Sequence, residues 1–220
     1  MARSSSPDAA DAATSAPSAI VEVFADVVCP FTHVGLRRFV QRRSELGRED
    51  VQLRIRAWPL ELVNGVPLDV DLVADEVDEL HREVAPDCFA GFRPDRFPAT
   101  SLPAMALADL AYEQGLDVGE QVSLELRSLL FERGVDISRP EVLQALAAEN
   151  DLDGDLDHRD AVLRDLAEGR RRGVVGSPHF FTPLGGFFCP ALDVARDETG
   201  RLRVRANRER FDQFLDACLT

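Results

Sequence analysis

The chain has 220 residues, 45% of them hydrophobic, so it can bury a substantial core as one domain or as one domain with a large insertion. Its formal net charge of −14 at pH 7 repels phosphate backbones and anionic lipid, which argues against nucleic acid and membrane surfaces as partners. Small molecules and proteins fit this charge better.

The first 19 residues are rich in Ala, Ser, Asp and Pro. They contain neither a basic stretch followed by an apolar one nor an apolar run of membrane length. We expect residues 1–19 to form a disordered tail on a cytoplasmic protein.

The first ordered elements follow a strand, helix, strand pattern. Residues 20–25 are an apolar run, residues 30–46 have helical periodicity, and residues 51–58 alternate between apolar and polar or small side chains until Pro59 ends the strand. This order predicts a right-handed βαβ unit with two parallel strands.

Helical periodicity then continues to about residue 173 without a strand candidate. We predict helices at residues 70–84, 101–114, 118–133, 140–150 and 157–172. The acidic stretch at 151–157 does not fit an EF-hand calcium loop and reads as a connection between two of these helices.

The β pattern resumes near the C-terminus. The pattern predicts a hairpin of residues 178–182 and 187–189 around a turn at 183–186, a short strand at 202–204 and an amphipathic helix at 208–219. The whole order predicts an α/β fold in which residues 20–60 and 174–220 form the core domain and residues 61–173 form an all-helical insertion.

Cys29 lies where the first strand gives way to the first helix. The helix dipole and the unpaired N–H groups of a first turn stabilise negative charge, so we expect the pKa of this thiol to fall below its usual value of about 8.5. Thr32 stands where a Cys-x-x-Cys redox motif has its second cysteine. No disulfide can therefore form within the motif.

Two segments carry a family resemblance. Residues 26–35, Asp-Val-Val-Cys-Pro-Phe-Thr-His-Val-Gly, resemble the active-site opening of the DsbA-like thioredoxin superfamily, in the branch with FrnE-type oxidoreductases, 2-hydroxychromene-2-carboxylate isomerases and kappa-class glutathione transferases. Residues 173–178, Gly-Val-Val-Gly-Ser-Pro, are similar to the family loop whose proline is cis and faces the active cysteine. The resemblance covers residue 20 to the C-terminus and implies a thioredoxin-like fold.

The resemblance also implies roles for residues. Cys29 would be a nucleophile that forms a mixed disulfide, which a low-molecular-weight thiol such as glutathione or mycothiol resolves, so no tightly bound cofactor is expected. The Thr32 hydroxyl would either donate to the Cys29 thiolate or merely fill the vacated position. The predicted substrate-binding residues are Pro30, Phe31, His33, Ser177 and Pro178.

Other readings of the same residues stay open. A kappa-like transferase or isomerase would use a cofactor thiol beside Cys29, and a non-catalytic binding protein would explain Thr32. Cys189 is a candidate resolving thiol, although its neighbours Phe187 and Phe188 favour burial. The two remaining cysteines, Cys88 and Cys218, read as structural.

Three further features have alternative interpretations; we prefer the simpler one for the first two and leave the third open. His33 lies one helical turn after Cys29 and would be half a metal site, an ion-pair partner that lowers the thiol pKa or, more simply, a polar surface residue; we predict no metal. The arginines at 170–172 would bind the carboxylates of a glutathione-like molecule or form a solvated helix end. The apolar faces of the insertion fit core packing and a homodimer equally well.

Overall fold

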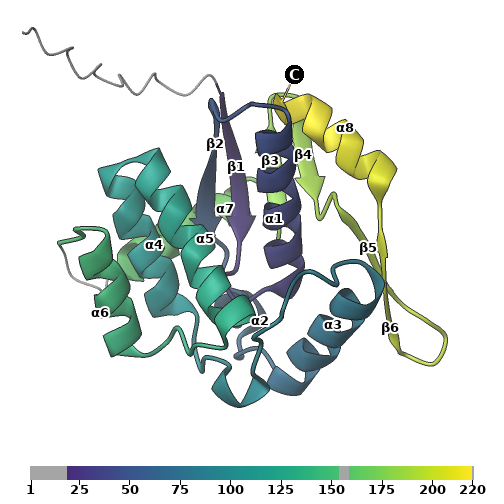
Figure 1. Ribbon diagram of the computed structural model, residues 1–220, viewed down its shortest axis with the longest axis horizontal. Helices are drawn as coiled ribbons and strands as arrows, with labels where there is room; N and C mark the ends of the chain where they lie inside the picture. The colour runs from purple at the N-terminus through teal and green to yellow at the C-terminus, as the bar shows by residue number, and fades with distance from the viewer. Residues whose placement is uncertain (1–18, 154–158, 220) are drawn as a thin grey trace, which may run out of the picture.

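A four-stranded mixed sheet forms the centre of the computed structural model, which describes residues 19–153 and 159–219. Its order is β2-β1-β3-β4 (Figure 1). Strand β1 (Ala19–Ala25) is parallel to β2 (Val51–Ala57) and antiparallel to β3 (His179–Thr182), which pairs in turn with β4 (Gly185–Phe188). Helix α1 (Pro30–Glu45) connects the parallel pair, as the sequence predicts.

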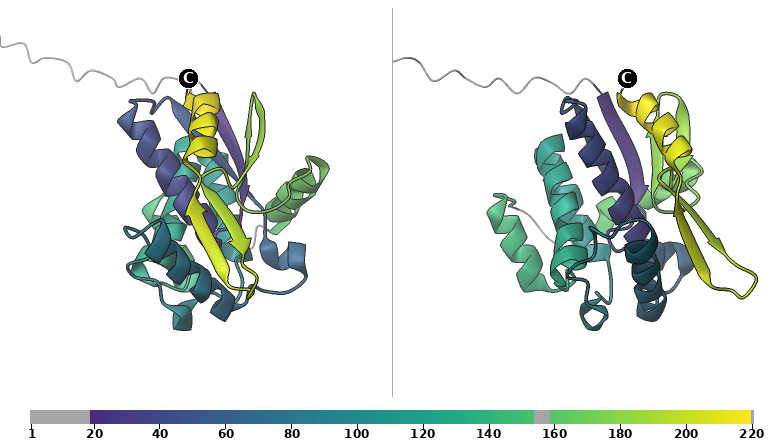
Figure 2. Two further views of the ribbon diagram at one scale, coloured as in Figure 1. Left: turned by 90° about the vertical axis from the view of Figure 1, so that its right-hand side faces the viewer. Right: turned by 45° about the vertical axis from the view of Figure 1, so that its right-hand side comes forward.

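Helices cover both faces of this sheet, and successive residues of the central strand β1 point to one face and then the other. Val21 and Val23 of β1 pack with residues of α1 and of α8 (Arg208–Leu219). Phe24 points to the other face, where it packs with Trp58 and with Leu166 of α7 (Arg159–Arg171). Figure 2 shows the resulting layers.

The helical segment between β2 and β3 consists of six α-helices and a short 3-10 helix in its described part. The predicted helices are confirmed to within two residues at each end that the structure describes, and the predicted start of the last one at residue 157 lies outside the described residues. A short helix after β2 was not predicted. The bounds are α2 (Leu60–Asn64), α3 (Val70–Glu83), η1 (Pro94–Arg96), α4 (Leu102–Gln114), α5 (Leu116–Arg133), α6 (Pro140–Glu149) and α7. The division into a core domain and an insertion at residues 61–173 stays a prediction.

Three helices of this segment close the outer edge of β2. The backbone N–H groups of Leu53, Ile55 and Ala57 point away from β1, and each donates to a side chain. The acceptors, one on each of α5, α4 and α7, are Glu120 (2.7 Å), Tyr112 (2.9 Å) and Asp165 (2.9 Å). Polar side chains thus satisfy an edge that would otherwise expose unpaired backbone groups.

The C-terminal part differs from the prediction in two places. Thr182 pairs with Gly185, so the turn is Pro183-Leu184 and both following glycines belong to β4. The expected strand at 202–204 is the first part of β6 (Leu202–Ala206). This strand pairs with β5 (Leu192–Arg196) in a separate two-stranded ladder that the sequence pattern did not predict.

Two of the predictions concern residues outside the ranges that the structure describes. Residues 1–18 of the proposed tail and 154–157 of the acidic connection lie outside the described residues, while β1 begins at Ala19. None of the described helices is both long and apolar enough to span a membrane.

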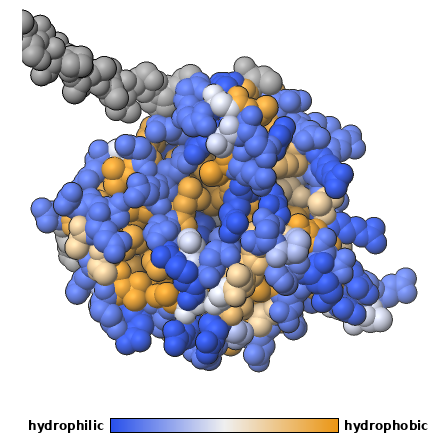
Figure 3. All heavy atoms as spheres, viewed as in Figure 1, coloured by the Kyte–Doolittle hydropathy of each residue, from blue (hydrophilic) through white to orange (hydrophobic). Residues whose placement is uncertain are grey.

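Hydrophilic residues dominate the face seen in Figure 3, and apolar ones show in hollows between them. A cavity of about 750 Å³ is lined by one face of α1, by α5 and by the end of α6. A second cavity, of about 470 Å³, lies at the N-terminus of α1.

Candidate active site

Cys29 caps the N-terminus of α1 and is 3% exposed. Its backbone is extended (φ −82°, ψ 116°), and Pro30 follows in the first turn, where its missing N–H costs no helical hydrogen bond. The Cys29 Sγ donates to the carbonyl oxygen of Ser177 at 3.4 Å. The fold therefore brings together two residues that are 148 positions apart in the chain.

The Ser177–Pro178 peptide bond is cis. The loop is tied to the start of α1 by side chains: the Asp26 N–H donates to Ser177 Oγ (2.9 Å), and the Ser177 and Thr32 hydroxyls share a hydrogen bond of 2.8 Å. Pro178 packs against α1, since a Cβ added at Gly35 would lie 3.8 Å from Pro178 Cγ.

The Cys29 thiol has a raised pKa, so the expectation of a lowered one is wrong for this conformation. Burial is the largest cause, because a thiolate loses its hydration there. Hydrogen bonds from the Thr32 hydroxyl, the Thr32 N–H and Ser177 act in the opposite direction and lower the pKa, while the charge of Glu76 raises it further. The helix N-terminus is present but does not outweigh the loss of water.

The cavity at the N-terminus of α1 brings together four of the predicted site residues, Cys29, Pro30, Phe31 and Ser177. Thr32 is fully buried and lies behind it. The cavity wall also contains apolar side chains and four polar ones that the prediction did not include, namely Asn64, Glu76, Asp193 and Arg210.

Cys189 lines the same cavity and is 6% exposed, so the preferred interpretation of a buried position is confirmed. Burial and the nearby Cys29 raise its pKa to about 12. All four cysteines are free and buried.

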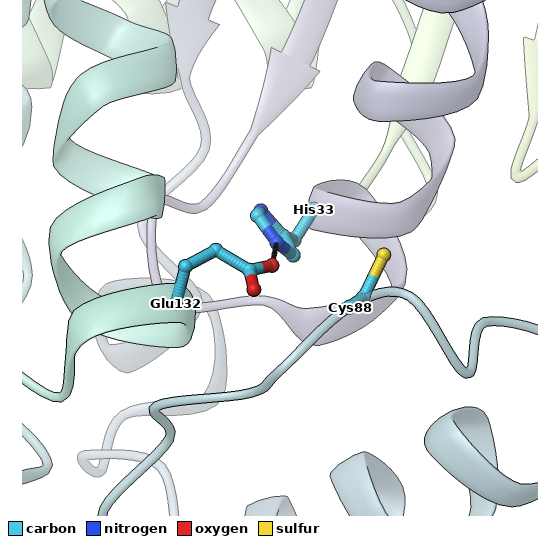
Figure 4. Close-up of side chains that lie close together, drawn as sticks. All are labelled: His33, Cys88 and Glu132. Carbon is cyan, nitrogen blue, oxygen red and sulfur yellow. Dashed lines mark hydrogen bonds and ion pairs between the residues drawn. The ribbon is translucent and has the colours of Figure 1, made fainter.

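His33 does not line the cavity at Cys29 and lines the larger cavity instead. It is 3% exposed, so the interpretation as a surface residue is wrong. Its Nε2 lies 2.6 Å from Glu132 Oε1 (Figure 4). Its ring packs against Phe89 and Phe131. Burial lowers the pKa of this imidazole, while the hydrogen bond to Glu132 and the charge of that carboxylate act in the opposite direction.

Cys88 lies near this pair, and one ligand-type atom from each of His33, Cys88 and Glu132 falls within 4.8 Å of the others (Figure 4). The Glu132 Oε1, however, also accepts from Arg37 Nη1 at 2.9 Å and from the Phe89 N–H at 3.1 Å. Its charge is already matched by a guanidinium, so the cluster reads as a hydrogen-bond network between α1 and α5.

The arginines at the end of α7 have different surroundings. Arg170 and Arg171 are exposed, and Arg171 pairs with Glu168, which agrees with a solvated helix end. Arg172 is half-buried, donates to Glu22 (2.6 Å) and lies 3.9 Å from the centre of the Phe181 ring. None of the three lines the cavity at Cys29.

Two buried charged residues beneath the site were missed. The Asp26 carboxylate accepts from the N–H groups of Val28 (3.0 Å) and Leu60 (2.6 Å), and burial raises its pKa to about 6. Arg127 of α5 is 3% exposed and donates to the Asp26 carbonyl oxygen at 3.3 Å. The sequence could have indicated a buried role for Asp26, because this carboxylate directly follows an apolar strand. It gave no such signal for Arg127 and Glu76, since charged residues are common in amphipathic helices.

Comparisons with known proteins agree with this architecture. The model of the DsbA-like thioredoxin domain family matches residues 20–196. No curated protein sequence matches the chain significantly.

Three solved structures share the fold at low sequence identity. A putative protein disulfide isomerase from Nitrosomonas europaea has 14% identity and a TM-score of 0.59, with 90% of this chain and 95% of that chain covered. A probable DsbA oxidoreductase from Streptomyces coelicolor has 21% identity and a TM-score of 0.56, covering 74% and 79%. A 2-hydroxychromene-2-carboxylate isomerase has 13% identity and a TM-score of 0.56, covering 77% and 88%.

Proposed function

This chain belongs to the DsbA-like thioredoxin domain family, and on that basis we propose that it is a thiol–disulfide oxidoreductase that acts through the single cysteine Cys29. The observation that carries the proposal is the position of Cys29: at the N-terminus of α1, against the Ser177–Pro178 loop and in the wall of a cavity. No other cysteine of the described residues combines these three features.

The reaction needs only one protein thiol. The Cys29 sulfur, after losing its proton, attacks one sulfur of a disulfide; the Cys29–sulfur bond forms, the substrate S–S bond breaks, and the leaving thiolate takes up a proton. A small thiol such as glutathione or mycothiol then attacks the mixed disulfide and returns Cys29 to the thiolate. The oxidation equivalents pass from one disulfide to another, so no further redox partner is required.

The hydroxyl groups around Cys29 can stabilise its thiolate. Ser177 Oγ accepts from the Asp26 N–H, so its own hydrogen is free to bond Thr32, and the Thr32 hydrogen is free to bond the Cys29 sulfur. Loss of the thiol proton also leaves the Ser177 carbonyl oxygen without its donor, free to accept from an extended substrate. Four free thiols suit the reducing cytoplasm that we propose as the location.

The test compares Cys29→Ser with Cys218→Ser, which removes a buried thiol that does not line the cavity. Bis(2-hydroxyethyl) disulfide is the substrate, glutathione or mycothiol is the reductant, and adducts are located by peptide mass spectrometry. We expect the mixed disulfide only at Cys29 and a loss of at least about a hundredfold in rate for Cys29→Ser alone. Equal rates in the two variants would reject the proposal.

The raised pKa of Cys29 favours one second candidate, a kappa-like thiol-dependent transferase or isomerase in which the bound cofactor supplies the thiolate. In that case Cys29→Ser would still bind glutathione and conjugate 1-chloro-2,4-dinitrobenzene. Thiol binding without turnover in either assay would instead indicate a non-catalytic binding protein.

A further inference from the structure

Glu76 is a second ionisable group in the cavity at Cys29. It lies on α3, in the helical segment, and α3 packs against β6 on the side of the molecule where α1 begins (Figures 1 and 2). Both Cys29 and Glu76 line the cavity, and the two groups interact electrostatically. The fold therefore exposes a thiol and a carboxyl to the same enclosed space.

The Glu76 carboxyl has no hydrogen bond and no ion pair within the described ranges, and only Arg196 attracts it over a longer distance. Its neighbour Glu79, one turn along the helix, is bound by Arg82. A half-buried carboxyl that no donor holds can both accept and release a proton at low cost.

Asp26, the other buried carboxyl near Cys29, is less suited to this task. Two backbone N–H groups bind its oxygens, it is fully buried, and it does not line the cavity. Its bonds fix the loop at Val28 and the start of α2 at Leu60, so it holds the site together.

We propose that Glu76 exchanges the proton with Cys29 during the reaction proposed above, on which this inference rests. The Glu76 carboxylate takes the proton of the Cys29 thiol as the sulfur attacks the substrate disulfide. The resulting carboxylic acid then gives that proton to the leaving thiolate, so that one disulfide and one protein thiol become one mixed disulfide and one free thiol. A cavity of about 470 Å³ admits water, which can carry the proton where the two groups do not touch.

The charges around Glu76 suit this role. The groups that face the cavity or Glu76 from other elements are Cys29, Cys189, Asp193, Arg196, Arg201 and Arg210, and Asp75, Asp78, Glu79 and Arg82 lie near it on α3. Burial raises the pKa of Glu76 to about 7, so its acid and base forms are both populated near neutral pH.

The experiment measures the rate of mixed-disulfide formation with bis(2-hydroxyethyl) disulfide between pH 5 and 10. The variants are Glu76→Gln, Glu76→Asp and, as a control, Asp78→Asn, which removes one negative charge from the exposed side of the same helix. We expect Glu76→Gln to react at least about tenfold more slowly at pH 7 and to lose the rise in rate near that pH. Glu76→Asp should keep this rise, and Asp78→Asn should match the unchanged protein.

Two results would overturn the inference. A faster reaction of Glu76→Gln at neutral pH would mean that the carboxylate only raises the pKa of Cys29 by repulsion, and an unchanged profile would mean that it takes no part. Both results concern Glu76 alone. The proposed function itself would fail only if Cys29→Ser reacted like the unchanged protein.

Discussion

Thr32 is the residue at which this chain departs from a dithiol motif, and its buried hydroxyl acts directly on Cys29. Thr32→Val keeps the shape and removes the hydroxyl. We expect the pKa of Cys29 to rise further and its alkylation rate at pH 7 to fall about tenfold, the effect of one hydrogen bond to a charged group.

The measurement is the pH dependence of Cys29 alkylation, read by peptide mass spectrometry. Thr32→Ser retains the hydroxyl and is the matched control. If Thr32→Val and Thr32→Ser gave the same profile, the hydroxyl would have no part in holding the thiolate.

The buried carboxyl of Asp26 should make the stability of the protein depend on pH. Its pKa is about 6 in the folded state against 3.8 for the free group, so the folded state binds its proton more tightly. The stability that this proton contributes is complete below pH 4 and is lost as the pH rises through about 6.

Urea unfolding of the unchanged protein and of Asp26→Asn at pH 4 to 7 shows in which direction stability changes with pH. Relative to the variant, the unchanged protein should lose stability across this range, by at most about 3 kcal/mol at 1.36 kcal/mol per pKa unit. A relative gain in stability would show that the hydrogen bonds to the carboxylate outweigh its burial.

Among the elements, β2 depends most visibly on side chains from elsewhere. The Tyr112 hydroxyl accepts from the Ile55 N–H and donates to the Leu53 carbonyl oxygen, both at 2.9 Å. Tyr112→Phe leaves these two buried groups without partners and should lower the free energy of unfolding by about 1–3 kcal/mol.

Chemical denaturation measures this loss. Gln144→Ala, on an exposed position of α6, is the control and should change stability by less than about 0.5 kcal/mol. A similar small change for Tyr112→Phe would mean that water replaces the hydroxyl.

The elements also show why part of the fold was predictable. Helices α3 and α5 have apolar residues at helical spacing because one face of each is buried, and this pattern is visible in the sequence. Strand β5 was missed because four of its five residues are exposed, which leaves no alternation. The turn was misplaced because glycine in β4 looks like a turn residue.

The site was predictable to a similar extent. The family resemblance pointed to Cys29 and the Ser177–Pro178 loop, and the fold brings them into contact. The pairing of His33 with Glu132, 99 residues away, depends on how α5 docks onto α1, which no local pattern encodes. The burial that raises the pKa of Cys29 is likewise a property of the assembled fold.

At the scale of the whole molecule, the net charge of −14 should select substrates by their charge. A net negative charge of this size repels an approaching anion and attracts a cation over a long range. Raising the salt concentration from 20 to 500 mM should increase the reaction rate with anionic glutathione disulfide by about threefold and decrease the rate with cationic cystamine by about the same factor.

Stopped-flow measurement of mixed-disulfide formation gives these rates, and neutral bis(2-hydroxyethyl) disulfide serves as the uncharged reference. A parallel response of all three disulfides to salt would show that the protein does not select substrates by charge, and a reversed response of the two charged disulfides would show that the field at the cavity differs in sign from the net charge.

The closed edge of β2 has a consequence for behaviour at high concentration. A strand from another molecule finds the N–H groups of Leu53, Ile55 and Ala57 already bound, and it would have to displace three side chains before it could pair. At the other end of the sheet, β4 pairs only with β3 among the described strands. The sheet can therefore be extended in one direction only, which prevents it from acting as a two-ended template for fibrous aggregation.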